Sequence, residues 1–237
     1  MNTNIFKLIT AIVAVLFTTA TTTAQGAKTM YLMKDGAVTH KVAVSDVDSI
    51  IFYEPAVVPA GGVLINGVVW ATCNVDAPGT FAATPESSGM FYQWNRKKAW
   101  PATDDVTGWD SSTPTGTEWE KSNDPSPSGW RVPTAAELRT LFQTANVTNE
   151  WTTQNGVTGR KFTDKTTGAF IFLPAAGSRG SSAGTFSSAG TVGRYWSSTY
   201  SGSGDACILT FDGSSAGVVN YDPCVYGRSV RAVAENN

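Results

Sequence analysis

The sequence predicts an α+β fold in which short strands and long loops accompany one clear helix. Two pairs, Asp35-Gly36 and Asn66-Gly67, lie between apolar runs and are typical of tight β-hairpins, because a primed turn needs positive φ. One capping box, at residues 134–137 (TAAE), marks the start of the helix. Charged residues make up only 15% of the chain, which also has 23 Gly and eight Trp. This composition favours strands and turns over a helical bundle.

The N-terminus has the pattern of a signal peptide. Lys7 supplies a positive charge, residues 8–17 are almost entirely apolar, and small residues precede Gln25. An apolar run of about ten residues is too short to cross a bilayer of about 30 Å as a helix. We therefore expect residues 1–24 to be removed after Ala24, with Ala20 as the alternative site. No cysteine lies near either site, so a lipoprotein anchor is not expected, and no later stretch is apolar enough to span a membrane.

Residues 28–54 are predicted to form a separate small β-hairpin unit. Strands are expected at 29–33 and 37–44, and a third apolar segment follows at 49–53. Three strands with one apolar face are marginally stable alone, so this unit is expected to dock on a neighbour or partner. Residues 55–62, with two Pro and a Gly pair, indicate a linker.

The main domain is predicted to span residues 63–237. Its first hairpin joins strands at 63–65 and 68–70. The capped helix places three apolar residues on one face, which would be buried against a sheet: Leu138, Leu141 and Phe142.

The second half of this domain is predicted to contain a buried strand at 169–173 and a long Gly/Ser-rich loop at 177–193. Closing strands are expected at 207–211, 216–219 and 229–233.

Composition narrows the chemistry. A net charge of −2 with scattered basic residues gives no footprint for nucleic acid. His40 is the single histidine, which leaves little material for a general base or a metal site, and no metal or cofactor is predicted. Cys73, Cys207 and Cys224 lack metal-ligand spacing. In an exported protein one pair can form a disulfide, and we favour Cys207 with Cys224 while leaving the other pairings open.

Five blocks in order resemble the Fibrobacter succinogenes major paralogous domain family. They cover most of residues 63–234 and are 89–94 (GMFYQW), 123–134 (NDPSPSGWRVPT), 173–177 (LPAAG), 193–199 (GRYWSST) and 229–233 (SVRAV).

The resemblance implies a C-type-lectin-like fold and a place on secreted or surface proteins of Bacteroidetes. Relatives often carry cysteine at the positions of Ser126 and Ala232, and losing both leaves no orphan thiol. The lectin-like fold is shared with the formylglycine-generating enzymes, in which a cysteine pair does the chemistry. Nothing near Cys207 or Cys224 would lower a thiol pKa, so no catalysis is expected.

Large side chains within these blocks are predicted to be structural. Trp94, Trp130 and Trp196 are expected to fill the core. Arg131 and Arg231 are expected to be buried beside a carboxylate, with Asp124 and Glu137 as the candidates. Three tryptophans in a polar loop are candidates for exposed aromatics instead: Trp100, Trp109 and Trp119.

The segment 200–228 is the candidate ligand-binding surface. It mixes tyrosines with Ser, Gly, Asp and Asn, as adaptable binding loops do. It also lacks Lys, Glu, Gln, Met and Trp, which resembles the output of randomised asparagine codons in proteins diversified by retroelements. A ligand-facing surface without diversification, or ordinary turns, are the alternatives. The candidate ligand-binding residues are Tyr200, Asp205, Asp212, Asn220, Tyr221, Asp222, Tyr226 and Arg228.

These features predict a secreted or cell-surface adhesion protein that binds an extracellular glycan or protein, with the periplasm as an alternative location. The first alternative function is a structural component of a surface assembly without a ligand site. A remote alternative is an oxidoreductase like the formylglycine-generating enzymes.

Overall fold

The computed structural model describes residues 28–47, 50 and 58–235 and divides the chain into two compact units, with the boundary between Pro55 and Ala56. The predicted signal peptide at 1–24 and most of the predicted segment 49–53 lie outside the described residues.

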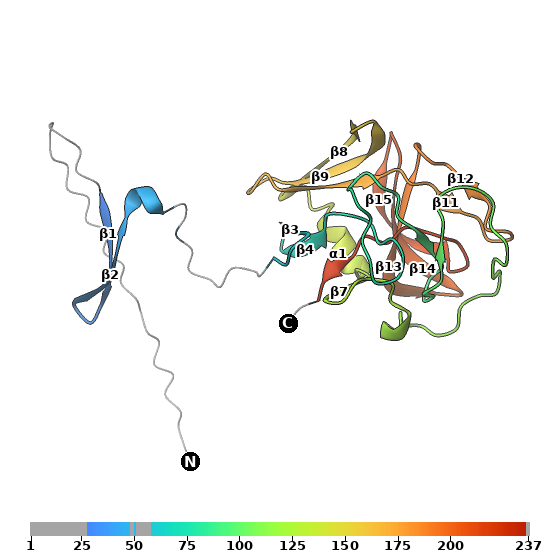
Figure 1. The fold of residues 1–237 in the computed structure, drawn as a ribbon, viewed down its shortest axis with the longest axis horizontal. Helices are drawn as coiled ribbons and strands as arrows, with labels where there is room; N and C mark the ends of the chain where they lie inside the picture. The colour runs from blue at the N-terminus through green and yellow to red at the C-terminus, as the bar shows by residue number, and fades with distance from the viewer. Residues whose placement is uncertain (1–27, 48–49, 51–57, 236–237) are drawn as a thin grey trace, which may run out of the picture. The chain divides into compact units, whose positions relative to one another are not determined.

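The first unit contains an antiparallel hairpin of β1 (Thr29–Lys34) and β2 (Ala37–Ala43), followed by a short 3-10 helix, η1 (Val44–Asp46) (Figure 1). Its turn is built as the sequence indicates, with Asp35 and Gly36 both at positive φ. The side chains of Tyr31, Leu32 and Met33 are exposed.

The second unit is built from several small antiparallel sheets, none of them closed. The four-stranded sheet has the order β3-β4-β16-β7, and two three-stranded sheets have the orders β10-β9-β8 and β13-β14-β15. Two further pairs are β5-β6 and β11-β12. The strands are β3 (Gly62–Ile65), β4 (Val68–Ala71), β5 (Phe91–Tyr92), β6 (Ala99–Trp100), β7 (Trp130–Arg131), β8 (Val147–Gln154), β9 (Val157–Asp164), β10 (Phe170–Pro174), β11 (Ser178–Arg179), β12 (Phe186–Ser187), β13 (Gly193–Gly202), β14 (Asp205–Phe211), β15 (Ala216–Pro223) and β16 (Val233–Ala234).

The predicted α+β class is wrong, because the protein is mostly β: strands account for 43% of the described residues and helices for 6%. The capped helix is present as α1 (Ala135–Thr140), with both bonds of the capping box formed, and a short 3-10 helix, η2 (Lys121–Asn123), precedes it. However, α1 has only six residues, and a single short helix cannot form a layer of its own.

The long hairpin β8–β9 accounts for much of this difference. Its two eight-residue strands meet at Asn155 and Gly156, both at positive φ, and Figure 1 shows them as a long ribbon. Asn155-Gly156 is the same kind of turn signal as the pairs that predicted the other two hairpins, but the predicted strands do not include this third hairpin. The predicted loop at 177–193 also contains strands, the pair β11 and β12. The predicted strand 229–233 is reduced to β16, because Ser229 makes only an isolated bridge with Tyr195.

The core confirms part of the aromatic prediction. Trp94, Trp130 and Trp196 are buried in one apolar cluster, as expected. Trp100 is also buried, so the prediction that it is exposed is wrong. Trp109 packs on Trp100 with ring centroids 4.8 Å apart, and Trp119 packs on Trp94 at 5.7 Å. The loop that carries Trp100, Trp109 and Trp119 therefore folds its rings inward.

The predicted Cys207–Cys224 disulfide is absent, and all three cysteines are free thiols. Strand register explains this. Asp205 pairs with Pro223, and the amide of Cys224 donates to the carbonyl of Gly204. Cys224 therefore lies opposite Gly204, and Cys207 is three residues beyond Gly204 along β14. This offset separates the two cysteines by about 10 Å, which is beyond the reach of a disulfide.

Candidate functional site

Three of the predicted binding residues, Asp222, Tyr226 and Arg228, line one cavity of about 330 Å³. The remaining lining residues come from β11, β12 and β13 and the residue after β11, and they contribute two further arginines and two serines. They are Ser178, Arg179, Gly180, Ser187 and Arg194. The cavity therefore lies where the C-terminal segment meets the Gly/Ser-rich segment that precedes β13.

Asp222 and Arg228 form a buried ion pair at one side of the cavity. Nε of Arg228 donates to one carboxylate oxygen of Asp222 at 2.6 Å, and Nη2 donates to the other at 3.0 Å. The guanidinium also lies over the ring of Tyr226, 4.5 Å from its centroid. This two-point geometry fixes Arg228 and Asp222 in one orientation.

Arg179 is fully buried and holds the surrounding loops through main-chain carbonyls. Its guanidinium donates to the carbonyls of Pro101, Thr103 and Asp104 from one loop, at 2.7–2.9 Å, and to that of Gly184 from another, at 2.5 Å. Burial lowers the pKa of Arg179, against the opposing charges of the nearby aspartates. All three nitrogens of the guanidinium are therefore engaged inside the protein.

Arg194 differs from the other two arginines of the cavity. Its Nη1 donates to the hydroxyl of Ser178 at 2.9 Å, and its guanidinium makes no ion pair within 4.0 Å among residues 28–47, 50 and 58–235. Burial lowers the pKa of Arg194, and the positive charge of Arg228 lowers it further. Arg194 is thus a partly buried cation with donors to spare.

The other predicted site residues lie outside this cavity. The hydroxyl of Tyr200 accepts a hydrogen bond from the amide of Gly204, and its ring packs on Trp94. Asp205 begins β14. Asp212 caps a turn by accepting hydrogen bonds from the hydroxyl and the amide of Ser214 and from the amide of Ser215, and these bonds lower its pKa to about 2.

Two of the predicted residues on β15 also lie apart from the cavity. Asn220 accepts a hydrogen bond from Arg139 of α1 at 2.6 Å, so its amide is engaged with the helix. Tyr221 is 72% exposed. Sequence reasoning placed these residues with Asp222. Successive residues of a strand point to opposite faces, so Tyr221 points away from Asp222. The register between β14 and β15 also shifts here, and Asn220 and Tyr221 together lie opposite Cys207.

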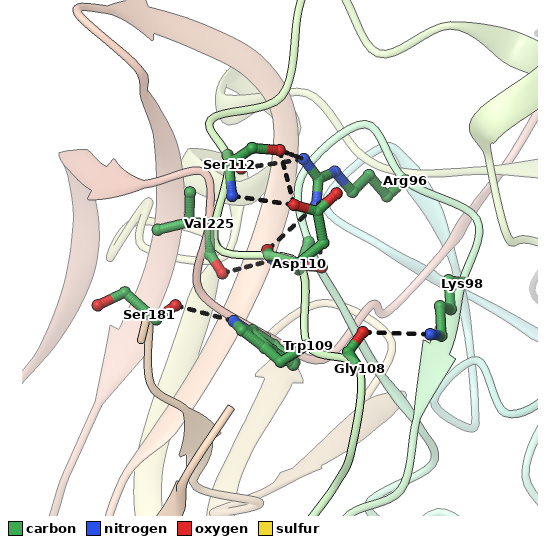
Figure 2. Close-up of polar contacts among 9 residues, drawn as sticks. Arg96, Lys98, Gly108, Trp109, Asp110, Ser112, Ser181 and Val225 are labelled. Atoms are coloured by element: carbon green, nitrogen blue, oxygen red, sulfur yellow. Dashed lines mark hydrogen bonds and ion pairs between the residues drawn. The ribbon is translucent and has the colours of Figure 1, made fainter. Parts of the chain in front are cut away.

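A second cavity, of about 500 Å³, lies beside the loop that carries Trp109 and Asp110. Figure 2 shows its contacts: Arg96 pairs with Asp110 at 2.6 Å and donates to the carbonyl of Ser112 at 2.9 Å. The indole of Trp109 donates to the carbonyl of Ser181, which ties this loop to the segment between β11 and β12. The ion pair at this cavity is exposed to solvent, so the first cavity is the stronger candidate.

Sequence reasoning missed Arg179 and Arg194. Arg194 lies in the 193–199 block, and Arg179 lies in the Gly/Ser-rich stretch for which the sequence predicts a loop. The available signal was the isolation of each arginine among apolar or small neighbours, since a buried arginine needs partners.

Within the part of the chain that the structure describes, no group of three or more His, Cys, Asp or Glu side chains could hold a metal ion. No helix in these same residues is long and apolar enough to cross a membrane.

Comparison of the chain with family models, with curated proteins and with solved structures found no match. The protein is therefore defined by its structure alone, as a β-rich chain of two units with a basic cavity in the larger unit.

Proposed function

We propose that this chain is an exported, non-catalytic binding protein of the cell surface or its surroundings, and that its ligand binds at the cavity between β11, β13 and β15. The resemblance to the Fibrobacter succinogenes major paralogous domain family also stays a prediction. The observation that carries the proposal is the gathering of three arginines and one aspartate around a polar cavity. Small-molecule sites are concave and have a few convergent polar groups, and volumes from about 300 Å³ are usual for them.

Export rests on the N-terminal pattern of residues 1–24. Expression of the full chain in a bacterial host, followed by N-terminal sequencing of the exported protein, tests it. The expected N-terminus is Gln25, and retention of the intact chain in the cytoplasm would contradict export.

Binding is tested with the mature chain on a glycan array and on whole cells. Tyr226→Ala removes a lining ring and should weaken binding about tenfold. Tyr221→Ala changes an exposed side chain of β15 outside the cavity. Loss of binding in this variant alone would show that the ligand binds the outer surface of β15 and not the cavity. Thermal unfolding of both variants checks that each is folded.

A structural component without a ligand site is the second candidate. It is favoured by the internal bonds of Arg179 and Arg228, which resemble a network that only stabilises loops. Absence of binding to any glycan or cell, by a folded mature chain, would select this alternative.

A further inference from the structure

The charges around the cavity do not cancel. Arg179, Arg194 and Arg228 face one carboxylate, that of Asp222, so the lining carries a formal excess of two positive charges. Both oxygens of Asp222 are engaged by Arg228. Asp104 and Asp105, outside the lining, partly offset the charge of Arg179, so the excess charge belongs mainly to Arg194.

Of these two, only Arg194 can meet a ligand. Arg179 is fully buried, and each of its three guanidinium nitrogens donates to a main-chain carbonyl. It contributes charge to the cavity but no free donor. Arg194 has one side-chain hydrogen bond, to Ser178, and its remaining N–H groups have no protein acceptor among the described residues.

Leaving a partly buried cation beside a second cation is unfavourable unless an anion or water compensates it. A guanidinium binds carboxylate, sulfate or phosphate groups through two parallel N–H donors, which gives both strength and orientation. The free donors of Arg194 match this mode.

The rest of the lining indicates what carries the anion. The hydroxyls of Ser178 and Ser187, the hydroxyl and ring of Tyr226 and the main chain of Gly180 surround the arginines. This lining offers polar groups and a single aromatic ring, which suits a polyhydroxylated ligand better than an apolar one.

We propose that the cavity binds the anionic group of an acidic saccharide and that Arg194 pairs with that group. This inference rests on the proposed binding function and names its ligand class. The carboxylate of a uronic acid and the sulfate of a sulfated sugar share the required chemistry.

Calorimetric titration of the mature chain tests this with glucuronic acid, glucose 6-sulfate and glucose as probes. Binding of at least one acidic sugar is expected, and whether the carboxylate or the sulfate binds identifies the source of the anion. Binding should weaken as NaCl is raised, because salt screens the ion pair. Neutral glucose should bind at least about tenfold more weakly, since the hydrogen bonds to a charged group are lost.

Arg194→Gln should lower the affinity for the acidic sugar about tenfold or more. Arg139→Gln is the matched control: like Arg194→Gln it removes one charge and one side-chain hydrogen bond, here to Asn220 outside the cavity, and it should leave the affinity unchanged. Thermal unfolding of both variants separates loss of binding from loss of fold.

The outcomes distinguish this inference from the proposed function. Equal binding of glucose and the acidic sugars, or an unaffected Arg194→Gln variant, would overturn the anion site while leaving a ligand-binding protein. Failure of all three sugars overturns the acidic-saccharide site, and the binding function then depends on the array and cell experiments.

Discussion

Arg231 shows how this protein stabilises a buried charge without a carboxylate. It is fully buried, and it donates to the side-chain carbonyl of Asn74 and to the main-chain carbonyls of Ala71, Thr72 and Phe172. The expectation that Asp124 or Glu137 pairs with it is wrong, whereas Arg131 does pair with Glu137. Neutral carbonyl acceptors, three from the main chain and one from Asn74, thus take the place of the predicted ion pair.

Replacement of Arg231 should be severely destabilising even when the charge is kept. Arg231→Lys cannot reach four acceptors at once, and each buried acceptor left unpaired costs about 1–3 kcal/mol. We expect urea unfolding to show a loss of at least about 3 kcal/mol. Arg139→Lys, at an exposed site with a single acceptor, Asn220, should lose no more than about 1 kcal/mol, and a similar value for Arg231→Lys would contradict this account.

Glu137 should make stability depend on pH. Burial acts to raise its pKa, but hydrogen bonds from Arg131 and from the amide of Thr134 outweigh burial and hold the pKa below its usual value. A carboxyl whose pKa is lowered on folding contributes stability above its unfolded pKa of about 4.3, and this contribution is lost as the pH falls through the folded value.

The free energy of unfolding of Glu137→Gln, measured against the wild type, tests this pH dependence. The difference should be about 1 kcal/mol at pH 7, because the carboxylate both caps the helix and pairs with Arg131. It should shrink toward pH 3. A difference that is constant or grows toward low pH would show that the carboxylate charge is not responsible.

The thiols should be unreactive in the folded protein, apart from Cys73. Cys207 and Cys224 are buried, and burial raises the pKa of both, that of Cys224 to about 12. Because the thiolate is the reactive form, iodoacetamide at neutral pH should modify only the partly exposed Cys73. Mass spectrometry should find three modified cysteines after denaturation without reductant, and fewer would reveal a disulfide.

At the scale of elements, the close packing of β13 against a ring from β14 requires glycine at one position. A Cβ on Gly193, in β13, would overlap the ring of Phe211 in the paired strand β14. Gly217, in β15 of the same sheet, has no atom near the corresponding position. The two positions therefore offer a matched pair.

Gly193→Ala should destabilise the protein by at least about 1–3 kcal/mol, the usual cost of overpacking. Gly217→Ala should be neutral or slightly stabilising, because it reduces the freedom of the unfolded chain. Thermal unfolding of the two variants decides the matter, and equal midpoints would mean that Phe211 moves aside without cost.

Local signals in the sequence predicted local structure. The Asp35-Gly36 and Asn66-Gly67 turns adopt the positive φ values that hairpins require, and the Thr134 cap forms as expected. The cavity could be predicted only in part, through Asp222, Tyr226 and Arg228. It also needs Arg179 and Arg194, and strand pairing between distant segments brings these into place. The residue spacing within any one segment does not predict that these segments come together around a cavity.

At the scale of the whole molecule, the two units are compact separately. Among the residues that the structure describes, all three clusters of buried apolar side chains lie within the larger unit. The strand β16, near the end of the chain, pairs with β4 near the start of this unit. The two ends of the larger unit thus hold each other in one sheet.

Residues 56–237 should therefore fold alone. Their thermal unfolding midpoint is expected to equal that of the main transition of the mature chain, and they should keep any ligand affinity. A lower midpoint for the shorter chain would show that the hairpin unit stabilises the larger one.

The bonds of Arg179 have a consequence for how the loops around the cavity can change during evolution. Its acceptors are main-chain carbonyls of Pro101, Thr103, Asp104 and Gly184, and every amino acid supplies a carbonyl. Substitutions at Thr103 would therefore leave these bonds intact. Asp104 is more restricted because its φ is positive, and a Cβ at Gly184 would overlap the ring of Trp109. The loop that Arg179 holds can thus exchange the side chain at Thr103, and with it the contacts that this side chain offers, while its main chain stays in place.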